Sequence, residues 1–243
     1  MGRRANSIQA IFVSLNSWFA HLEENGMIEK NPIPYIRAKY LKSYKDEVRQ
    51  RQLIGVEDAA KMVRATIDTR DKAILLVFLK TGIRLNELIS LDLEDLDLMG
   101  GKLILKPTAK RSNRIVFFDE ETSRALSRWL KSRELRFKKG DHQALFISSK
   151  GTRLQTSGVD KLVREAAMRI GLHNHDSEKL EEKFTPHACR HWNTTQLLRA
   201  GMRREYVQWL RGDAIKEAVD IYFHVDPEDV RRAYLAAVPQ LGI

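Results

Sequence analysis

The chain has 243 residues, of which 43% are hydrophobic and 30% charged. This length and composition allow one large or two smaller globular domains with a sizeable core, and no apolar run reaches the roughly 18 residues of a membrane span. Lys and Arg number 42 against 32 Asp and Glu, a net charge of +10. We therefore expect attraction to a polyanion, most often nucleic acid, although an anionic membrane surface or simple solubility would account for the same balance.

The cysteine content and the first residues bear on the compartment. Cys189 is the only cysteine, which excludes an internal disulfide and fits a reducing environment. The opening Met-Gly-Arg-Arg lacks the apolar core of a signal peptide. We expect an intracellular protein in the cytoplasm, associated with the nucleoid when it is bound to DNA.

The N-terminal region predicts one clear helix followed by a basic stretch. Apolar residues recur at helical spacing between residues 8 and 22, and Gly26, Pro32 and Pro34 end the pattern. Residues 37–51 are rich in Lys and Arg, including Lys39 and Lys42, and we interpret them as a linker or a DNA-facing helix. We expect residues 1–45 to form a helical segment, a linker to run to about 53, and a second domain to span 54–243.

The second domain opens with helical patterns. A helix is predicted over residues 56–67, and the unbroken apolar run 73–79 favours a helix buried on several sides. Gly82 ends that run and Arg84 begins the next turn. This placement puts Arg84 near a helix N-terminus, where backbone donors and the helix dipole also favour phosphate.

A small antiparallel sheet should follow. Residues 102–105 and 114–118 read as strands around a polar turn at 108–113, and residues 145–147 predict a third strand. Further helices are predicted over 157–170, 186–200, 203–210, 215–222 and 227–237, with a charged, flexible insertion at 173–183. The expected fold class is therefore α+β, mainly α with a small antiparallel β-sheet.

Four side chains from distant motifs suit phosphodiester chemistry. Arg84 and Arg190 offer planar, permanently charged forks that match the oxygens of a phosphate gaining negative charge. His187 can transfer a proton near neutral pH. The Tyr222 hydroxyl can serve as a nucleophile when nearby cations favour its phenolate.

The chain carries three segments in this order: TGIRLNEL around Arg84, HACRH at 187–191, and the closing helix with Tyr222. In these segments the chain resembles a tyrosine recombinase of the phage integrase and Xer type, over roughly Ile54 to Pro239. The resemblance implies a recombinase catalytic domain preceded by a helical core-binding domain. About 45 residues are too few for that whole N-terminal domain, so either the sequence begins within it or this member has a reduced arm.

The resemblance also implies residue roles. Tyr222 would attack the scissile phosphate, Arg84 and Arg190 would stabilise the transition state, and His187 would assist proton transfer. A lysine on the β-hairpin would protonate the leaving 5′-oxygen; spacing favours Lys110, with Lys106 and Arg111 as rivals. Glu87, three residues after Arg84 on the same helix face, would position an arginine rather than act as an acid catalyst. Lys39, Lys42, Arg111 and Arg114 are candidate DNA contacts.

Asp213 departs from the family pattern. It stands nine residues before Tyr222, where these proteins usually carry His or Trp. An ionised aspartate cannot donate a hydrogen bond to phosphate and would repel it. Either the position is dispensable, or Asp213 turns away to orient Arg211 or Arg190, or activity is weakened. Similar archaeal integrases carry Gly-Asp here, which favours the first two interpretations.

The expected function is site-specific cleavage and rejoining of DNA through a 3′-phosphotyrosyl intermediate, without ATP, metal or other cofactor. The i, i+4 pair His187 and His191 lacks the glutamate of a metalloprotease helix, so we expect no metal site. The expected partners are double-stranded DNA carrying a recombination site and three further copies, the free protein being a monomer or dimer. Alternatives are a non-catalytic DNA-binding protein of the same fold and a type IB topoisomerase-like relaxing enzyme.

Overall fold

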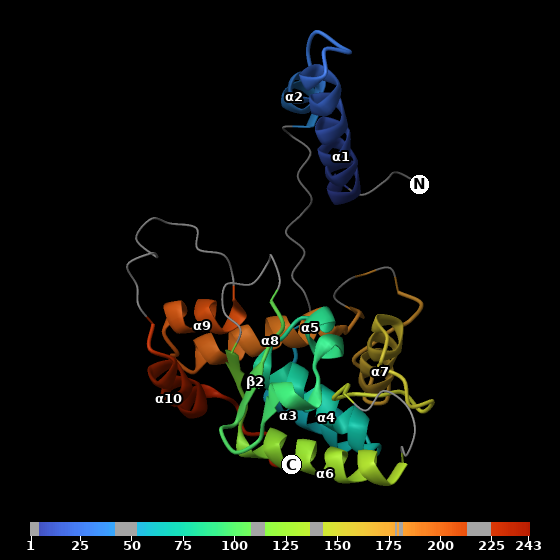
Figure 1. Ribbon diagram of the computed structural model, residues 1–243. Coiled ribbons are helices and arrows are strands. Elements are labelled where there is room, and N and C mark those ends of the chain that lie inside the picture. Colours follow the sequence, from blue (N-terminus) through green and yellow to red (C-terminus); the bar gives the residue numbers. More distant parts are fainter. Residues whose placement is uncertain are drawn as a thin grey trace. The chain divides into compact units, whose positions relative to one another are not determined.

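The computed structural model describes residues 5–41, 53–107, 115–136, 143–177, 179, 182–212 and 225–243. The chain divides into two compact units, Met1–Gln50 and Arg51–Ile243 (Figure 1). The first unit contains helix α1 (Ala5–Glu24), the short helix α2 (Ile33–Ile36) and a π-helical turn η1 (Arg37–Leu41). The Asn31 amide donates to the Asn16 side-chain oxygen at 3.2 Å, and Ile33 is buried. These contacts fold α2 back against α1.

The second unit is mainly helical with a small sheet. Its elements in chain order are α3 (Val56–Arg64), α4 (Thr69–Thr81), α5 (Leu85–Ser90), η2 (Leu93–Asp95), β1 (Leu96–Asp97), β2 (Lys102–Ile104), β3 (Ile115–Phe117), α6 (Glu120–Arg136), α7 (Thr156–Met168), α8 (Pro186–Arg199), α9 (Arg204–Arg211) and α10 (Pro227–Ala237). This composition confirms the predicted fold class. Within the described ranges, no helix combines the length and apolarity needed to cross a membrane.

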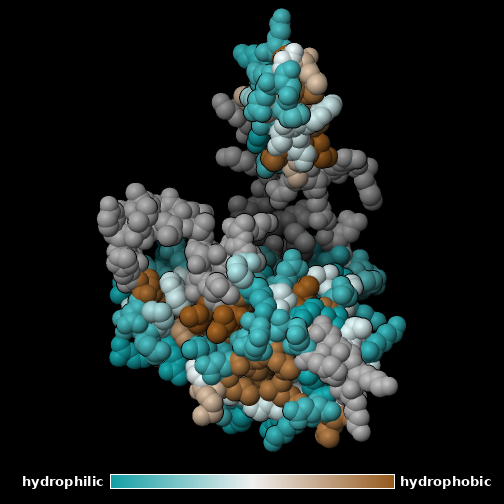
Figure 2. All heavy atoms as spheres, viewed as in Figure 1, coloured by the Kyte–Doolittle hydropathy of each residue, from teal (hydrophilic) through white to brown (hydrophobic). Residues whose placement is uncertain are grey.

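Helix α4 forms the centre of this unit. The Asp68 side chain caps its first turn by accepting from the backbone amides of Arg70 and Asp71, and every residue from Ala73 to Thr81 is buried. It packs against α6 on one side and α8 on another, which explains why its sequence is apolar all round rather than striped. On the face drawn in Figure 2, hydrophilic residues predominate and the apolar residues that reach it gather in a few patches.

The antiparallel sheet, in the order β1-β2-β3, separates two apolar clusters. Leu103 of β2 pairs with Val116 of β3, and both side chains belong to the main cluster around α4. Phe117, the next residue along, points the opposite way because strand side chains alternate. It joins the second cluster with α9 and α10, where its ring stacks on Trp209 at a centroid distance of 6.2 Å.

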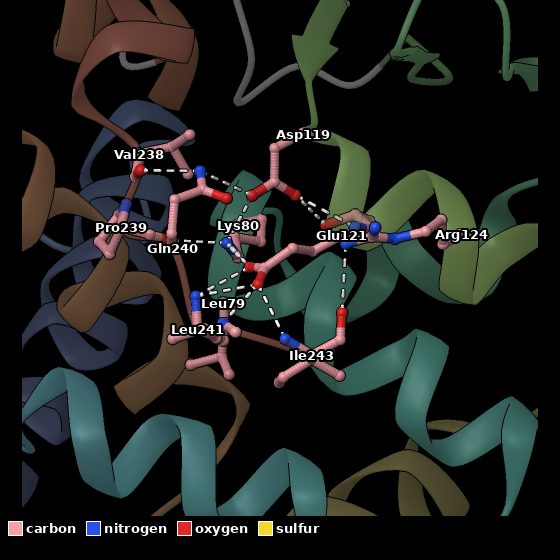
Figure 3. Close-up of polar contacts among 12 residues, drawn as sticks. Leu79, Lys80, Asp119, Glu121, Arg124, Val238, Pro239, Gln240, Leu241 and Ile243 are labelled. Carbon is pink, nitrogen blue, oxygen red and sulfur yellow. Dashed lines mark hydrogen bonds and ion pairs between the residues drawn. The ribbon is translucent and has the colours of Figure 1, made fainter.

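A buried ion-pair cluster anchors the C-terminal residues to α4 and α6 (Figure 3). The Lys80 Nζ lies 2.5 Å from Asp119 Oδ2 and 2.6 Å from Glu121 Oε2, and it donates to the Pro239 carbonyl. The Glu121 carboxylate also accepts from the backbone amides of residues 241, 242 and 243. A fully buried lysine is tolerated because two carboxylates and a carbonyl satisfy its three donors.

One expectation about the elements was wrong, and one helix was not predicted. The third strand is Leu96–Asp97, which pairs with β2, whereas residues 145–147 form a buried segment with only an isolated bridge between Ile147 and Arg153. Its polar groups bond elsewhere: the Leu145 amide donates to the Leu91 carbonyl at 2.9 Å, and its carbonyl accepts from the Trp129 indole. Helix α6 was not expected, because its charged residues obscure the apolar face that includes Trp129.

Candidate active site

The two arginine motifs meet at one pocket of the second unit. Its volume is about 340 Å³, and it lies between the starts of α5 and α8, with one side chain from α7. The lining residues are Ile83, Arg84, Leu85, Asp160, Thr185, Pro186, His187 and Arg190. Three predicted site residues, Arg84, His187 and Arg190, are thus brought together although more than 100 positions separate the first from the others.

Arg84 is the N-cap residue of α5 and is tied to Glu87 one turn later. The Arg84 backbone amide donates to Glu87 Oε2 at 2.7 Å, and its Nη1 donates to Glu87 Oε1 at 3.0 Å. The Glu87 side chain is 3% exposed, whereas that of Arg84 is 33% exposed. The buried carboxylate therefore restrains a guanidinium that still reaches the pocket.

Arg190 is buried and is oriented by two backbone carbonyls. Its Nη1 donates to the Gly82 carbonyl at 2.7 Å and its Nη2 to the Arg211 carbonyl at 2.9 Å. Gly82 follows α4 and Arg211 is the last residue of α9. One guanidinium thereby connects the ends of two helices, and its plane is set by both.

His187 lies at the beginning of α8, one turn before Arg190, and is exposed. Pro186 occupies the first turn and the Thr185 side chain makes no capping hydrogen bond. At this end of α8, Pro186 has no backbone N–H and the amides of Ala188 and Cys189 donate to the Thr185 carbonyl, so the helix offers the pocket the positive end of its dipole. Together with two arginines, this is a suitable environment for a phosphate group.

Cys189 is adjacent to Arg190 but takes no part in this chemistry. It is fully buried in the main apolar cluster, and burial raises the pKa of its thiol far above the ordinary value. The thiol therefore stays neutral and unreactive. His191, one turn after His187, is exposed.

Lys106, one rival for the catalytic lysine, is held by a group of acidic side chains. Its Nζ lies 3.0 Å from Asp92, 3.1 Å from Asp95 and 3.7 Å from Glu94. Hydrogen bonds to Asp92 and then Asp95 raise the pKa of the Lys106 ammonium. A more weakly acidic ammonium with these partners is a poorer proton donor to a leaving group.

Several predicted residues lie outside the described residues: Lys42, Lys110, Arg111, Arg114, Asp213 and Tyr222. Lys39 is described and belongs to the first unit, where it is exposed. Its Nζ lies 5.6 Å from the Tyr35 ring centroid and 5.3 Å from that of Tyr40. The basic residue therefore stands beside two aromatic rings, a combination compatible with binding a nucleic-acid backbone.

Sequence reasoning missed Asp160, the acidic residue of the pocket. It forms an ion pair with Arg164 one turn later on α7. An Asp and an Arg four residues apart on a helix are ordinarily a surface pair, so the sequence carries no sign of this location. The Arg164 partner reduces the repulsion that the carboxylate exerts on an entering phosphate.

The phage integrase family model matches residues 48–229, three quarters of the chain. The chain belongs to the phage integrase family. Its relatives include a tyrosine recombinase XerC from Thermodesulfovibrio yellowstonii, 33% identical over 96% of this chain and 76% of the relative. Another XerC, from Alcanivorax borkumensis, is 30% identical over 98% of this chain and 75% of the relative.

Solved structures agree with this phage integrase assignment at the level of the fold. A Tn1549 transposon integrase in complex with circular intermediate DNA superposes with a TM-score of 0.71 at 20% identity, covering 96% of this chain and 79% of that one. The XerA recombinase superposes with a TM-score of 0.60 at 24% identity, covering 94% and 83%. As a phage integrase family member related to XerC proteins, the chain is a site-specific recombinase.

Proposed function

We propose that this recombinase breaks and rejoins DNA at a specific site through a covalent 3′-phosphotyrosyl intermediate. The observation that carries the proposal is the pocket shared by Arg84, His187 and Arg190 at the start of α8. Two fixed guanidinium groups can hold the non-bridging oxygens of a phosphodiester and stabilise the charge that develops there.

In the proposed cleavage step, the Tyr222 oxygen attacks the phosphorus and forms the 3′-phosphotyrosyl bond. The bond from phosphorus to the 5′-oxygen breaks, and Lys110 supplies the proton that the departing oxygen takes up. His187 assists transfer of the tyrosine proton and contacts the phosphate. A free 5′-hydroxyl from a second strand then attacks the phosphotyrosyl bond and releases Tyr222.

Two further features of the proposed reaction are the choice of Lys110 as the proton donor and the absence of a cofactor. Lys110 is preferred because its rival Lys106 is engaged by three carboxylates. Asp213 is proposed to support an arginine rather than to touch the phosphate. The phosphodiester energy is conserved in the phosphotyrosyl bond and side-chain cations stabilise the transition state, so the proposed reaction uses neither ATP nor a divalent metal.

Double-stranded DNA carrying the recombination site is the proposed partner, and the cytoplasm, where such DNA lies, is the proposed compartment. The net charge of +10 supports attraction to DNA. The comparison structures include Tn1549 transposon integrase complexes with DNA, which supports a DNA partner for this fold. Lys39, Lys42, Arg111 and Arg114 are the proposed backbone contacts, with residues 1–45 acting as a partial core-binding segment and 54–243 as the catalytic domain.

Strand exchange between two duplexes requires four active sites, so we propose a homotetramer on DNA and a monomer or dimer in free solution. The segment from Val230 to Leu241 is the candidate for linking copies. In the described structure this segment packs on its own unit, with Leu241 buried and its amide bonded to Glu121. Exchange between identical copies would replace each contact by its equivalent.

The test is covalent trapping on a nicked or phosphorothiolate suicide duplex carrying the attachment site, in EDTA, with Tyr222→Phe as the control. We expect a protein–DNA adduct that survives SDS and is lost in the variant. A tightly bound site without an adduct would overturn the proposal and indicate a non-catalytic DNA-binding protein. Relaxation of any supercoiled plasmid, without preference for the site, would indicate a topoisomerase instead.

A further inference from the structure

The last turn of α4 is held by a side chain from α8. Asn193 is 4% exposed, and its Nδ2 donates to the Leu79 carbonyl at 2.9 Å and to the Lys80 carbonyl at 2.7 Å. The final carbonyls of a helix have no partner within the helix, and burying them without one is costly. Both donors of the Asn193 amide are therefore used to close this turn.

The same side chain also lies against Gly82. The residue has φ of +62°, and a β-carbon added there would stand 2.7 Å from the Asn193 Oδ1. Gly82 is in turn the residue whose carbonyl accepts from Arg190 Nη1 at 2.7 Å. Asn193 thus contacts both the turn and the glycine that orients the buried arginine.

Contacts from other elements also hold this turn in place. The Tyr234 hydroxyl donates to the Lys80 carbonyl at 3.0 Å, and the Lys80 ammonium is fixed by Asp119 and Glu121 (Figure 3). The turn cannot shift away from these buried groups without breaking their bonds. Helix α8 contacts the turn through Asn193, which lies one turn after Arg190.

We propose that Asn193 is a positioning residue for DNA strand cleavage. By holding the Leu79 and Lys80 carbonyls it sets the location of the Gly82 carbonyl, which orients the Arg190 guanidinium toward the scissile phosphate. Asn193 itself touches no DNA. This inference rests on the proposed function, because it assigns to Arg190 the contact with the transferred phosphate. A displacement of about 1 Å in a group that contacts the reacting atoms can lower a rate about 100-fold.

The experiment compares Asn193→Leu, which keeps the volume but removes the amide, with Asn193→Asp, which keeps the shape but loses both donors. Gln196→Leu is the matched control, because Gln196 is a buried amide on the same helix and, among the described residues, makes no side-chain hydrogen bond to the turn. Each full-length variant is assayed for single-turnover adduct formation and DNA affinity, well below its unfolding temperature. In DNA-free protein labelled at arginine, NMR measures rotation about the Arg190 Cζ–Nη bonds.

We expect both Asn193 variants to form adduct at least about tenfold more slowly, with DNA affinity within about twofold of wild type, and faster Arg190 rotation. Gln196→Leu should retain wild-type rotation and a rate within about twofold. Unchanged Arg190 rotation in Asn193→Leu, or equal rate losses in Asn193→Leu and Gln196→Leu, would overturn the positioning role. If wild type forms no adduct but rotation still accelerates, the proposed function fails while the positioning of Arg190 stands.

Discussion

The Glu87 carboxylate binds Arg84 at two points, since one oxygen accepts from the Arg84 backbone amide at 2.7 Å and the other from its Nη1 at 3.0 Å. The Glu87 carboxylate therefore caps the first turn of α5 and also restrains the Arg84 guanidinium. Capping boxes are usually a matter of helix stability alone. Here the box lies at the edge of the pocket that also contains Arg190.

Replacing Glu87 by Gln is expected to slow adduct formation about 10- to 100-fold, because an amide cannot accept from both Arg84 donors and one becomes misdirected. DNA affinity should change little, since the charge of Arg84 is kept. Single-turnover trapping and a binding titration measure the two quantities. Asn86→Ala, an exposed change on the same helix, should leave both as in wild type; an equal loss in the two variants would refute the prediction.

Gly82→Ala should destabilise the second unit by about 2–4 kcal/mol, because a β-carbon there meets both a left-handed backbone and the Asn193 side chain. Gly171 has φ of +74° but nothing within 4 Å of an added β-carbon. Gly171→Ala should therefore cost only about 1 kcal/mol, the backbone part of the penalty. Urea unfolding measures both, and similar losses would show that the Asn193 contact is unimportant.

The stability of the second unit should depend on pH through Glu121. Burial alone would raise the pKa of this carboxyl, but hydrogen bonds from Lys80 and from the amides of Leu241 and Ile243 outweigh burial and lower its pKa below the ordinary 4.5. A carboxyl whose pKa is lower in the folded state stabilises the fold above its unfolded pKa, and this stabilisation is lost as the pH falls through its folded pKa.

Urea unfolding of wild type at a series of pH values below about 5 should therefore show a steeper loss of stability than Glu121→Gln. The variant should also be less stable near neutral pH by about 3 kcal/mol, because a buried ion pair is broken. Glu120→Gln, an exposed neighbour, should follow the wild-type curve. Parallel curves for wild type and Glu121→Gln would contradict the assignment.

Substitutions of Lys106 and Lys110 should have different effects on the cleavage rate, and only one should be rescued by a leaving group that needs no proton. We expect Lys110→Ala to slow cleavage of an ordinary duplex by about 10²- to 10³-fold, as loss of a general acid does. A 5′-bridging phosphorothiolate should restore the rate, because a thiolate leaves without a proton. Lys106→Ala should cleave ordinary DNA within about threefold of wild type, since its ammonium is committed to Asp92 and Asp95. Rescue of Lys106→Ala instead would reverse the two roles.

The sequence by itself determined the fold class, the positions of most described helices and the identity of the arginine motifs. Helices such as α4 and α10 follow from apolar patterns and from residues that start or stop a helix, which act within a few positions along the chain. The prediction for residues 227–237 coincides with α10. The family motifs around Arg84 and Arg190 are equally local, since each is a short run of neighbouring residues.

The tertiary structure decided which groups meet. The hydrogen bond from Arg190 to Gly82 joins residues 108 positions apart in the sequence, and the one from Asn193 to Leu79, near the end of α4, joins residues 114 positions apart. Such contacts depend on how α4 and α8 pack, and no local pattern encodes that geometry. Packing likewise placed Asp160 in the pocket and satisfied the polar groups of Leu145 without a strand. Long-range polar contacts form only after the apolar faces have fixed the positions of the helices, so only the folded chain reveals them.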